Sequence, residues 1–381
     1  MVNKERLVNE FMSLVRVDSE SRHEGQIANL LVKKLQDLGC EVYVDDAGAK
    51  TGSETGNVIA RLPGKEDVPV VLFSAHMDTV SPGKGVQPVL EKSIIRSDGT
   101  TILGADDKAG IAAILEAIQV IREDNLPHGD LEFVFTVCEE VGLAGIKFLD
   151  FSRLKAEMAY ILDSNGSVGT IVNHGPAQDE IYAEMRGKSA HAGINPEDGI
   201  NAIQAASKSI ASMQLGRIDH ETTANIGVIS GGVAINIVPD TVMIKGECRS
   251  LQEEKRIQQT ASMCRALEQA ASDAGAEVNF KVETVYPVMY VHEEALVVRL
   301  AKKAALAIAL KAVVKSTGGG SDTHIFNQNN IPAVNLGIAM QKVHTVNEFI
   351  TVNDLVLNAS FVVSIMTRLA RSSMVEGELS F

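Results

Sequence analysis

The stretch VVLFSAHMD, from Val70 to Asp78, is a run of apolar and β-branched residues that ends in a histidine and a carboxylate. Three more runs of this kind occur along the chain: DLEFVFTV, MAYILDS and PAVNLGI, at residues 130–137, 158–164 and 332–338. Continuous apolar runs of this length are typical of strands that are buried on both faces in a parallel sheet. The sequence therefore predicts these four runs as strands of one sheet.

Amphipathic stretches alternate with the four runs and predict helices over residues 24–38, 110–124 and 293–310. The first residues, MVNKERLVNEFMSLVRV, alternate polar and apolar residues at helical spacing and lack the apolar core of a secretion signal. They predict a first helix. We expect an α/β fold whose mixed, mostly parallel sheet is covered by helices.

The pattern changes between about residues 177 and 288. The predicted elements there are a strand, a helix, three strands, a helix and a strand, over residues 180–187, 199–213, 224–230, 232–239, 241–250, 253–275 and 276–284. This order is close to the β-α-β-β-α-β signature of a ferredoxin-like α+β unit. A chain of 381 residues also exceeds the size at which one core stops growing. We predict two domains: residues 1–176 with 289–381, and the inserted residues 177–288.

Composition narrows the classes of function. The formal net charge of −14 disfavours nucleic acid and anionic membrane surfaces as partners. No apolar run approaches the roughly 18 residues of a membrane helix. The four cysteines are widely spaced, which predicts reduced thiols rather than a disulfide framework or a thiolate zinc site. We expect a cytoplasmic protein.

His76 and Asp78 stand two residues apart at the end of the first run. On an extended strand their side chains point to the same face, so one can bind a metal ion while the other orients it. Taken alone, this pattern favours a structural histidine.

The other predicted strands lead to similar residues: Glu139, Glu140, Asp163 and His344. Ligands gather at the carboxyl ends of strands in open α/β sheets. Acidic and imidazole groups that converge there need a cation, because burying unpaired carboxylates is costly.

Asp106 and Asp107, in GADDKAG, precede a predicted helix. They either bridge two ions or only stabilise the helix N-terminus through the helix dipole. Nitrogen and oxygen donors without thiolates suit Zn²⁺, with Mn²⁺ or Co²⁺ as substitutes. Two such ions would activate a water and bind the substrate carbonyl oxygen. One of Glu139 and Glu140 would then be a ligand and the other a general base.

The motifs HMDTV, GADDKAG, TVCEEVG, ILDS, GKSAHAG and GGGSD, in this order over almost the whole chain, resemble the M20 family of metallopeptidases, and most of all its peptidase T branch. The resemblance implies that His76 and Asp163 bind one zinc ion, that Glu140 and His344 bind the other, and that Asp106 bridges them. It makes Glu139 the general base.

The same resemblance gives Asp78 an orienting role and implies a cis peptide bond between Asp106 and Asp107. The third ligand, Asp163, is a glutamate in other M20 branches, and this difference favours an aminopeptidase or dipeptidase.

In the inserted domain the resemblance points to His191 as a group that stabilises the oxyanion, sometimes from a partner subunit. Asn236 and Arg249 are similar to the family's substrate contacts and are expected on neighbouring strands, with Arg249 binding a peptide carboxylate. Without the resemblance these residues are an ordinary surface histidine, a turn asparagine and a solvated arginine. Gly318–Asp322 is expected to form a glycine-rich wall beside the substrate.

The motifs and the resemblance together predict a di-zinc exopeptidase for short peptides, in particular a tripeptide aminopeptidase. The resemblance further implies that the inserted domain acts as a lid and forms a homodimer. An M20-type N-acyl-amino-acid deacylase or dipeptidase is the close alternative. The alternative from another functional class is a non-catalytic binding protein with the same fold. Such a protein is expected to lack one or more of the metal ligands, and the sequence contains all five.

Overall fold

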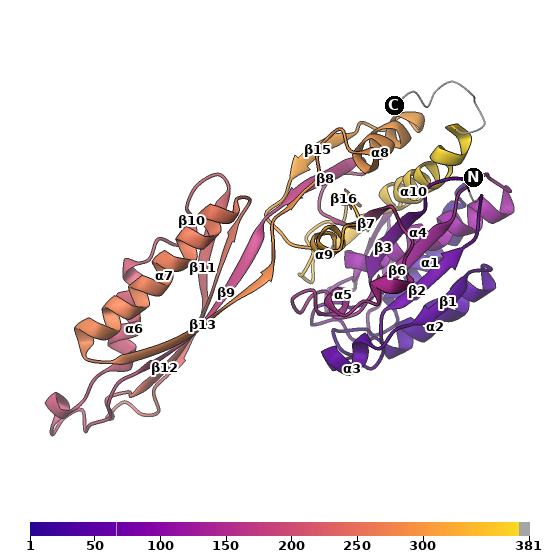
Figure 1. Cartoon of the computed structure of the whole chain (residues 1–381). Helices are drawn as coiled ribbons and strands as arrows, with labels where there is room; N and C mark the ends of the chain where they lie inside the picture. The colour runs from indigo at the N-terminus through magenta and orange to yellow at the C-terminus, as the bar shows by residue number, and fades with distance from the viewer. Residues whose placement is uncertain (66, 373–381) are drawn as a thin grey trace. The chain divides into compact units, whose positions relative to one another are not determined.

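The computed structural model describes residues 1–65 and 67–372. Its contacts divide the chain into two units, each shown in Figure 1. Unit 1 contains Met1–Asn173, Tyr290–Ser316 and the chain from Ser321 onward, and unit 2 contains His174–Met289 and Thr317–Gly320. The expected insertion, residues 177–288, lies within unit 2. The glycine-rich segment Thr317–Gly320 belongs to unit 2 as well.

A mixed sheet forms the centre of unit 1. Its strands lie in the order β1 (Glu41–Val44), β2 (Val58–Leu62), β6 (Leu131–Thr136), β3 (Val71–His76), β7 (Met158–Ser164), β16 (Ala333–Gly337), β8 (Thr170–Gly175) and β14 (Met289–Tyr290), and β15 (Val313–Ser316) also pairs with β8. The central strands β6, β3, β7 and β16 are parallel. These are the four runs predicted from the sequence. The flanking pairs β1–β2, β2–β6 and β16–β8 are antiparallel, so the sheet is mixed and its centre is parallel.

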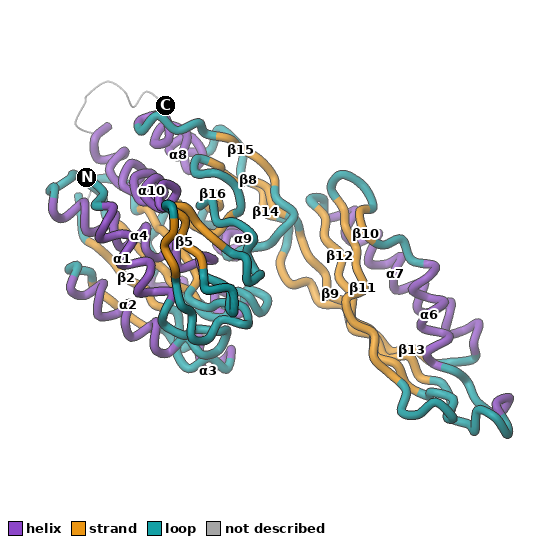
Figure 2. The backbone as a smooth tube through the Cα atoms, turned by 180° about the vertical axis from the view of Figure 1, so that it is seen from behind, coloured by secondary structure: helices purple, strands orange, loops and turns teal. Residues whose placement is uncertain are grey.

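Helices cover this sheet (Figure 2). They are α1 (Lys4–Val15), α2 (Gly25–Asp37), α3 (Ala47–Thr51), α4 (Ala105–Glu123), α5 (Ala144–Lys147), α8 (Leu296–Ala307), α9 (Thr323–Gln328) and α10 (Val352–Ser372). Helix α4 packs on β3 and β7 and is itself covered by α1 and α10. Its middle part, residues 109–121, consists mostly of alanine, glycine and large aliphatic residues, which suits this position because nearly all of the helix is buried.

Three strands outside the main sheet form a small one, in which β5 (Ile94–Arg96) lies between β4 (Val89–Glu91) and β17 (Phe349–Thr351). Strand β17 leads directly into α10. The window Val352–Ala370 of α10 is long and apolar enough to cross a membrane by length and composition, with a mean hydropathy of 1.2. Half of that window is buried in the structure, and α10 packs on α4, α8 and α1, as the core helix of a globular domain does.

Unit 2 is an antiparallel sheet with two helices. Its strands lie in the order β10 (Gly216–Arg217), β11 (Thr222–Gly231), β12 (Thr241–Ser250), β9 (Ala177–Arg186) and β13 (Glu277–Tyr286). Helices α6 (Ala202–Ser212) and α7 (Glu253–Ala274) pack together and against this sheet. Alanine, aliphatic and sulfur-containing side chains of both helices and of the sheet form a separate core. The four long strands and two helices follow the expected β-α-β-β-α-β order.

The predicted strand over residues 232–239 is wrong. This segment is a loop, and Ile237 forms an isolated bridge with His191. Gly232 has a φ of +80°, in the left-handed region that turns the chain at the end of β11. Val233 and Ile235 are 87% and 104% exposed, so the alternation of apolar residues that predicted a strand has no sheet to pack on.

Candidate metal centre

The predicted ligands lie where parallel strands of unit 1 end. His76 is the last residue of β3, and Asp163 lies near the end of β7. Glu140 follows β6, and His344 lies in the loop after β16. Asp106 is in the first turn of α4. Because β6, β3, β7 and β16 run in the same direction, these positions meet at one edge of the sheet.

The first turn of α4 has an irregular backbone. Asp106 has φ −81° and ψ 100°, and Asp107 has φ −120° and ψ 28°, both outside the helical range. The peptide bond between them is cis, as the resemblance implied. The carboxylate of Asp107 accepts a hydrogen bond from the main-chain N–H of His76 at 3.2 Å. This contact ties the start of α4 to the end of β3.

The two oxygens of Asp106 face different partners. Oδ1 lies 3.0 Å from Nε2 of His76, and that nitrogen is 4.0 Å from Oδ1 of Asp163. Oδ2 lies 3.3 Å from Nε2 of His344, which is 2.8 Å from Oε1 of Glu140. Asp106 thus stands between two groups of donors, one of His76 and Asp163 and the other of His344 and Glu140.

These distances fit two cations held by a shared carboxylate. Two donors bound to one tetrahedral Zn²⁺ at 2.0–2.2 Å lie about 3.3–3.6 Å apart, and the donor separations at this site run from 2.8 to 4.0 Å. Ligand atoms of His76, Asp106 and Glu140 also lie within 4.8 Å of one another. The side chains of Asp106, Asp163 and Glu140 are only 10–11% exposed, so most of the water that would solvate their charges is excluded.

The pKa values of four side chains at this edge are raised, so that each side chain binds a proton more readily than usual. Hydrogen bonds to Asp106 and Glu140 raise the pKa of His344 to about 10. Burial alone would lower the pKa of His76, but Asp106 and Asp78 raise it well above the ordinary value. Burial, together with the charge of Asp106, raises the pKa of Asp163, and burial with the charge of Asp163 raises that of Glu139. Divalent cations would satisfy the same demand without protons.

Asp78 holds the segment that carries Glu139 and Glu140. Its Oδ1 accepts the main-chain N–H of Glu139 at 2.9 Å, and its Oδ2 accepts that of Glu140 at 3.2 Å. Nδ1 of His76 lies 2.9 Å from the main-chain carbonyl oxygen of Asp78 and 3.5 Å from its carboxylate. The nearer contact is therefore with the carbonyl. If Nδ1 carries the proton, Nε2 is left to face Asp106 as a ligand atom.

Two buried acids that support the site were missed from the sequence. Glu24 is fully buried and accepts hydrogen bonds from the main-chain N–H of Cys138, at 3.0 Å, and from the hydroxyl of Ser53. Glu348 is 1% exposed and accepts three main-chain N–H groups near Asp106. Neither lies in one of the recognisable motifs, and only the folded chain distinguishes them from surface acids.

The predicted substrate contacts lie in unit 2. His191 is exposed, and its Nδ1 accepts the N–H groups of Gly193 and Ile194 at 3.2 Å each. The main-chain oxygen of Asn236 accepts the N–H of Ala192 at 3.0 Å, so the structure brings His191 and Asn236 together. Asn236 lies in the loop before β12, not on a strand as predicted.

Arg249 lies at the other end of β12 and donates to Oε2 of Glu247 through Nε and NH2, at 3.2 and 2.9 Å. Strand β12 contains ten residues, which at about 3.3 Å each span roughly 30 Å. Within one chain, Arg249 and the pair of His191 and Asn236 therefore stand too far apart to contact the same short peptide.

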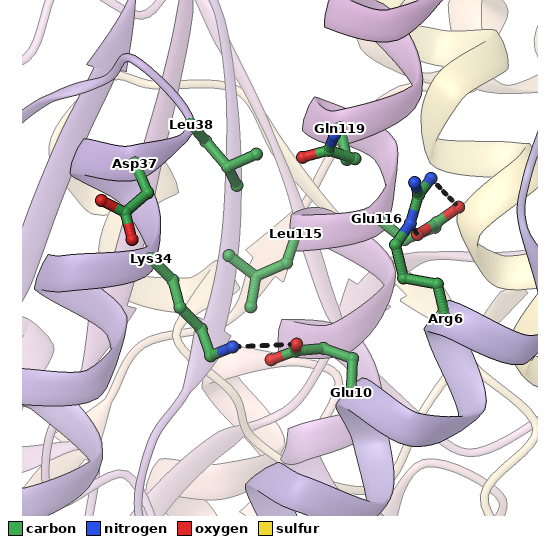
Figure 3. A pocket seen from close by; sticks show the side chains of 8 residues that line it. All are labelled: Arg6, Glu10, Lys34, Asp37, Leu38, Leu115, Glu116 and Gln119. Atoms are coloured by element: carbon green, nitrogen blue, oxygen red, sulfur yellow. Dashed lines mark hydrogen bonds and ion pairs between the residues drawn. The ribbon is translucent and has the colours of Figure 1, made fainter.

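A separate cavity of about 240 Å³ lies among α1, α2 and α4 of unit 1 (Figure 3). Its charged groups already have partners: Arg6 pairs with Glu116 at 2.6 Å, Lys34 with Glu10 at 2.9 Å, and Asp37 with Lys33 at 3.3 Å. The predicted site residues are not among those that line it. This cavity is therefore distinct from the candidate metal centre.

Sequence comparison finds a family model and relatives that match most or nearly all of the chain. The model of peptidase family M20/M25/M40 matches residues 72–368. The uncharacterized protein YqjE of Bacillus subtilis is 47% identical over 371 residues, which cover 97% of this chain and 100% of the relative. Peptidase T of Vibrio cholerae is 27% identical over 397 residues, with 91% and 94% covered.

Two crystal structures are similar over nearly the whole chain. Aminopeptidase PepT from Bacillus cereus has 49% identity and a TM-score of 0.88, with 97% of this chain and 99% of that chain covered. A tripeptidase from Staphylococcus aureus has 42% identity and a TM-score of 0.94, with 97% and 100% covered.

Proposed function

The chain belongs to peptidase family M20/M25/M40, and we propose that it is a cytoplasmic di-zinc aminopeptidase that removes the N-terminal residue from tripeptides. The observation that carries the proposal is the position of Asp106, whose two carboxylate oxygens face His76 with Asp163 on one side and His344 with Glu140 on the other. The substrate class follows from relatives described as an aminopeptidase and a tripeptidase.

The five ligands would hold two cations, which when bound supply Lewis acidity toward the scissile carbonyl and toward water. Glu139 does the proton transfer. It is the neighbour of the ligand Glu140 and is itself buried, and burial followed by the charge of Asp163 raises its pKa. Its carboxylate accepts a proton from the attacking water and then gives it to the amine that leaves.

Asp78 orients this base. By accepting the N–H groups of both Glu139 and Glu140, it fixes the main chain that carries the base and a ligand. Proton transfer requires the base to lie within about 3 Å of the water. A fixed backbone holds the base near that position and so lowers the entropy cost of reaching it.

Unit 2 would supply the substrate contacts as a lid, and a homodimer accounts for their separation. His191 and Asn236 lie at one end of β12 and Arg249 at the other. Two copies joined through unit 2 would let the loop of one chain and Arg249 of its partner serve one site. Arg249 would then exchange its contact with Glu247 for the carboxylate of a peptide.

The cytoplasmic location rests on the four cysteines. Cys40, Cys138, Cys248 and Cys264 are all free and buried, and burial raises the pKa of the Cys40 and Cys138 thiols to about 12. Such thiols are unreactive and suit a reducing compartment.

A substrate panel tests the reaction. The zinc-loaded protein is expected to hydrolyse free tripeptides with a kcat/KM about 10- to 100-fold above that for N-blocked tripeptides, because the blocked substrates lack the charged amine as a partner. N-acyl amino acids and dipeptides, assayed in parallel by release of free amine, represent the deacylase and dipeptidase alternatives. Faster hydrolysis of either class would contradict the tripeptidase proposal, and chelated protein provides the background rate.

A further inference from the structure

Glu348 joins the two loops that carry Asp106 and His344. Its Oε2 accepts the main-chain N–H groups of Leu103 and Gly104 at 2.8 and 2.7 Å, and its Oε1 accepts that of Asp106 at 3.0 Å. The carboxylate is 1% exposed. Such a concave run of N–H groups is an anion-binding arrangement, and here a side chain of the same protein fills it.

Main-chain hydrogen bonds also fix the loop that carries His344 and leads to Glu348. Gln341 and Phe349 exchange main-chain hydrogen bonds at 3.0 and 3.1 Å, which close the loop that contains His344, and the N–H of Glu348 bonds to the carbonyl of Thr345 at 3.0 Å. Glu348 therefore lies at the end of the loop that contains His344, while its side chain binds the main chain of residues 103–106, where α4 begins. Oδ2 of Asp106 and Nε2 of His344 are 3.3 Å apart.

We propose that Glu348 is a positioning residue that sets the distance between Asp106 and His344 and so allows one carboxylate to serve both cations. This inference rests on the proposed metal pair. Glu348 touches neither the predicted ligand side chains nor the reacting atoms, and it acts through the main chain of Asp106. Loss of its contacts would let the first turn of α4 shift relative to His344 and weaken the cation between them.

Glu132 provides a matched control. It is 2% exposed and accepts the main-chain N–H groups of Lys155, at 2.9 and 3.1 Å, and Ala156, at 3.0 Å. It is thus a buried carboxylate of unit 1 that binds main-chain N–H groups in the same way, but those groups precede β7 rather than bear a ligand. Glu132→Gln reports the general cost of losing such a contact.

The experiment is a titration of metal-free protein with Zn²⁺ in competition with a chromophoric chelator, together with circular dichroism. Glu348→Gln is expected to weaken the lower-affinity of the two binding events about 10- to 100-fold, while the Glu132→Gln protein keeps the wild-type affinities. The kcat of the Glu348→Gln protein on a tripeptide is expected to recover as Zn²⁺ is raised, which a general loss of folding would not produce.

A folded Glu348→Gln protein with wild-type affinity for both ions would overturn the inference, as would an equal loss in the Glu132→Gln protein. Glu348→Asp keeps the charge but shortens the reach by one methylene, so it decides the question by the same titration if Glu348→Gln does not fold. Wild-type protein that binds no Zn²⁺ would remove the proposed function itself and this inference with it.

Discussion

Replacing Glu139 by glutamine is expected to lower kcat on a tripeptide about 10²- to 10⁴-fold while the bound metal stays unchanged. Glutamine has nearly the same shape but does not accept a proton at neutral pH. The adjacent Glu140, the proposed ligand, keeps its position, because its N–H and that of residue 139 remain bound to Asp78. Steady-state kinetics and metal analysis of the same protein sample measure both quantities.

A fall in activity that simply follows a loss of metal would contradict this assignment, since it would make Glu139 a ligand rather than the base. Unchanged kcat would exclude Glu139 from proton transfer. Glu54→Gln is a suitable control, because Glu54 is a surface glutamate of the same unit that contacts His23 and the N–H of Gly25.

Replacing Asp106 by asparagine is expected to have the other large effect. Asparagine keeps one oxygen, but an amide nitrogen then faces one of the two histidines in place of an acceptor, so both donor groups lose part of a shared ligand. We expect the stoichiometry of bound Zn²⁺ to fall and kcat/KM to drop by about 10³-fold or more, since the cations stabilise several kcal/mol of developing charge.

Thermal unfolding gives an independent measurement of the same change. Ligand that binds only the folded state at 100 times its Kd stabilises a protein by about 2.7 kcal/mol, so a chelator should lower the Tm of the wild type and have little effect on the Asp106→Asn protein. Asp98→Asn, in an exposed turn where Asp98 contacts Thr100, should behave like the wild type. An Asp106→Asn protein with two tightly bound ions would contradict the bridging role.

The central strands were predictable because a strand that is buried on both faces consists mostly of apolar residues. Each of the four parallel strands is a mostly apolar run, and the polar residues inside these runs, Ser74, Glu132 and Asn335, are themselves buried. Strand β1, with the sequence EVYV, is short and mostly exposed, and it was not predicted. The loop after β11 shows the opposite case, where apolar alternation in residues 232–239 predicted a strand that no neighbouring strand pairs with among the described residues.

The candidate ligands were predictable for a different reason. His76, Glu140 and Asp163 each place a carboxylate or imidazole at or just after the end of an apolar run, and the order of the motifs matched a family. Glu24 and Glu348 differ from surface glutamates only in what surrounds them after folding. Their partners are main-chain N–H groups far away in the sequence, and main-chain groups carry no residue-specific signal.

The measurement that tests the account most directly is an anomalous difference map from crystals of the protein grown with Zn²⁺, recorded on both sides of the zinc absorption edge. We expect two peaks about 3.5 to 4 Å apart, one beside His76 and Asp163 and one beside His344 and Glu140, with the carboxylate of Asp106 between them. A map in which these side chains surround no zinc, or in which the ions bind elsewhere, would contradict it.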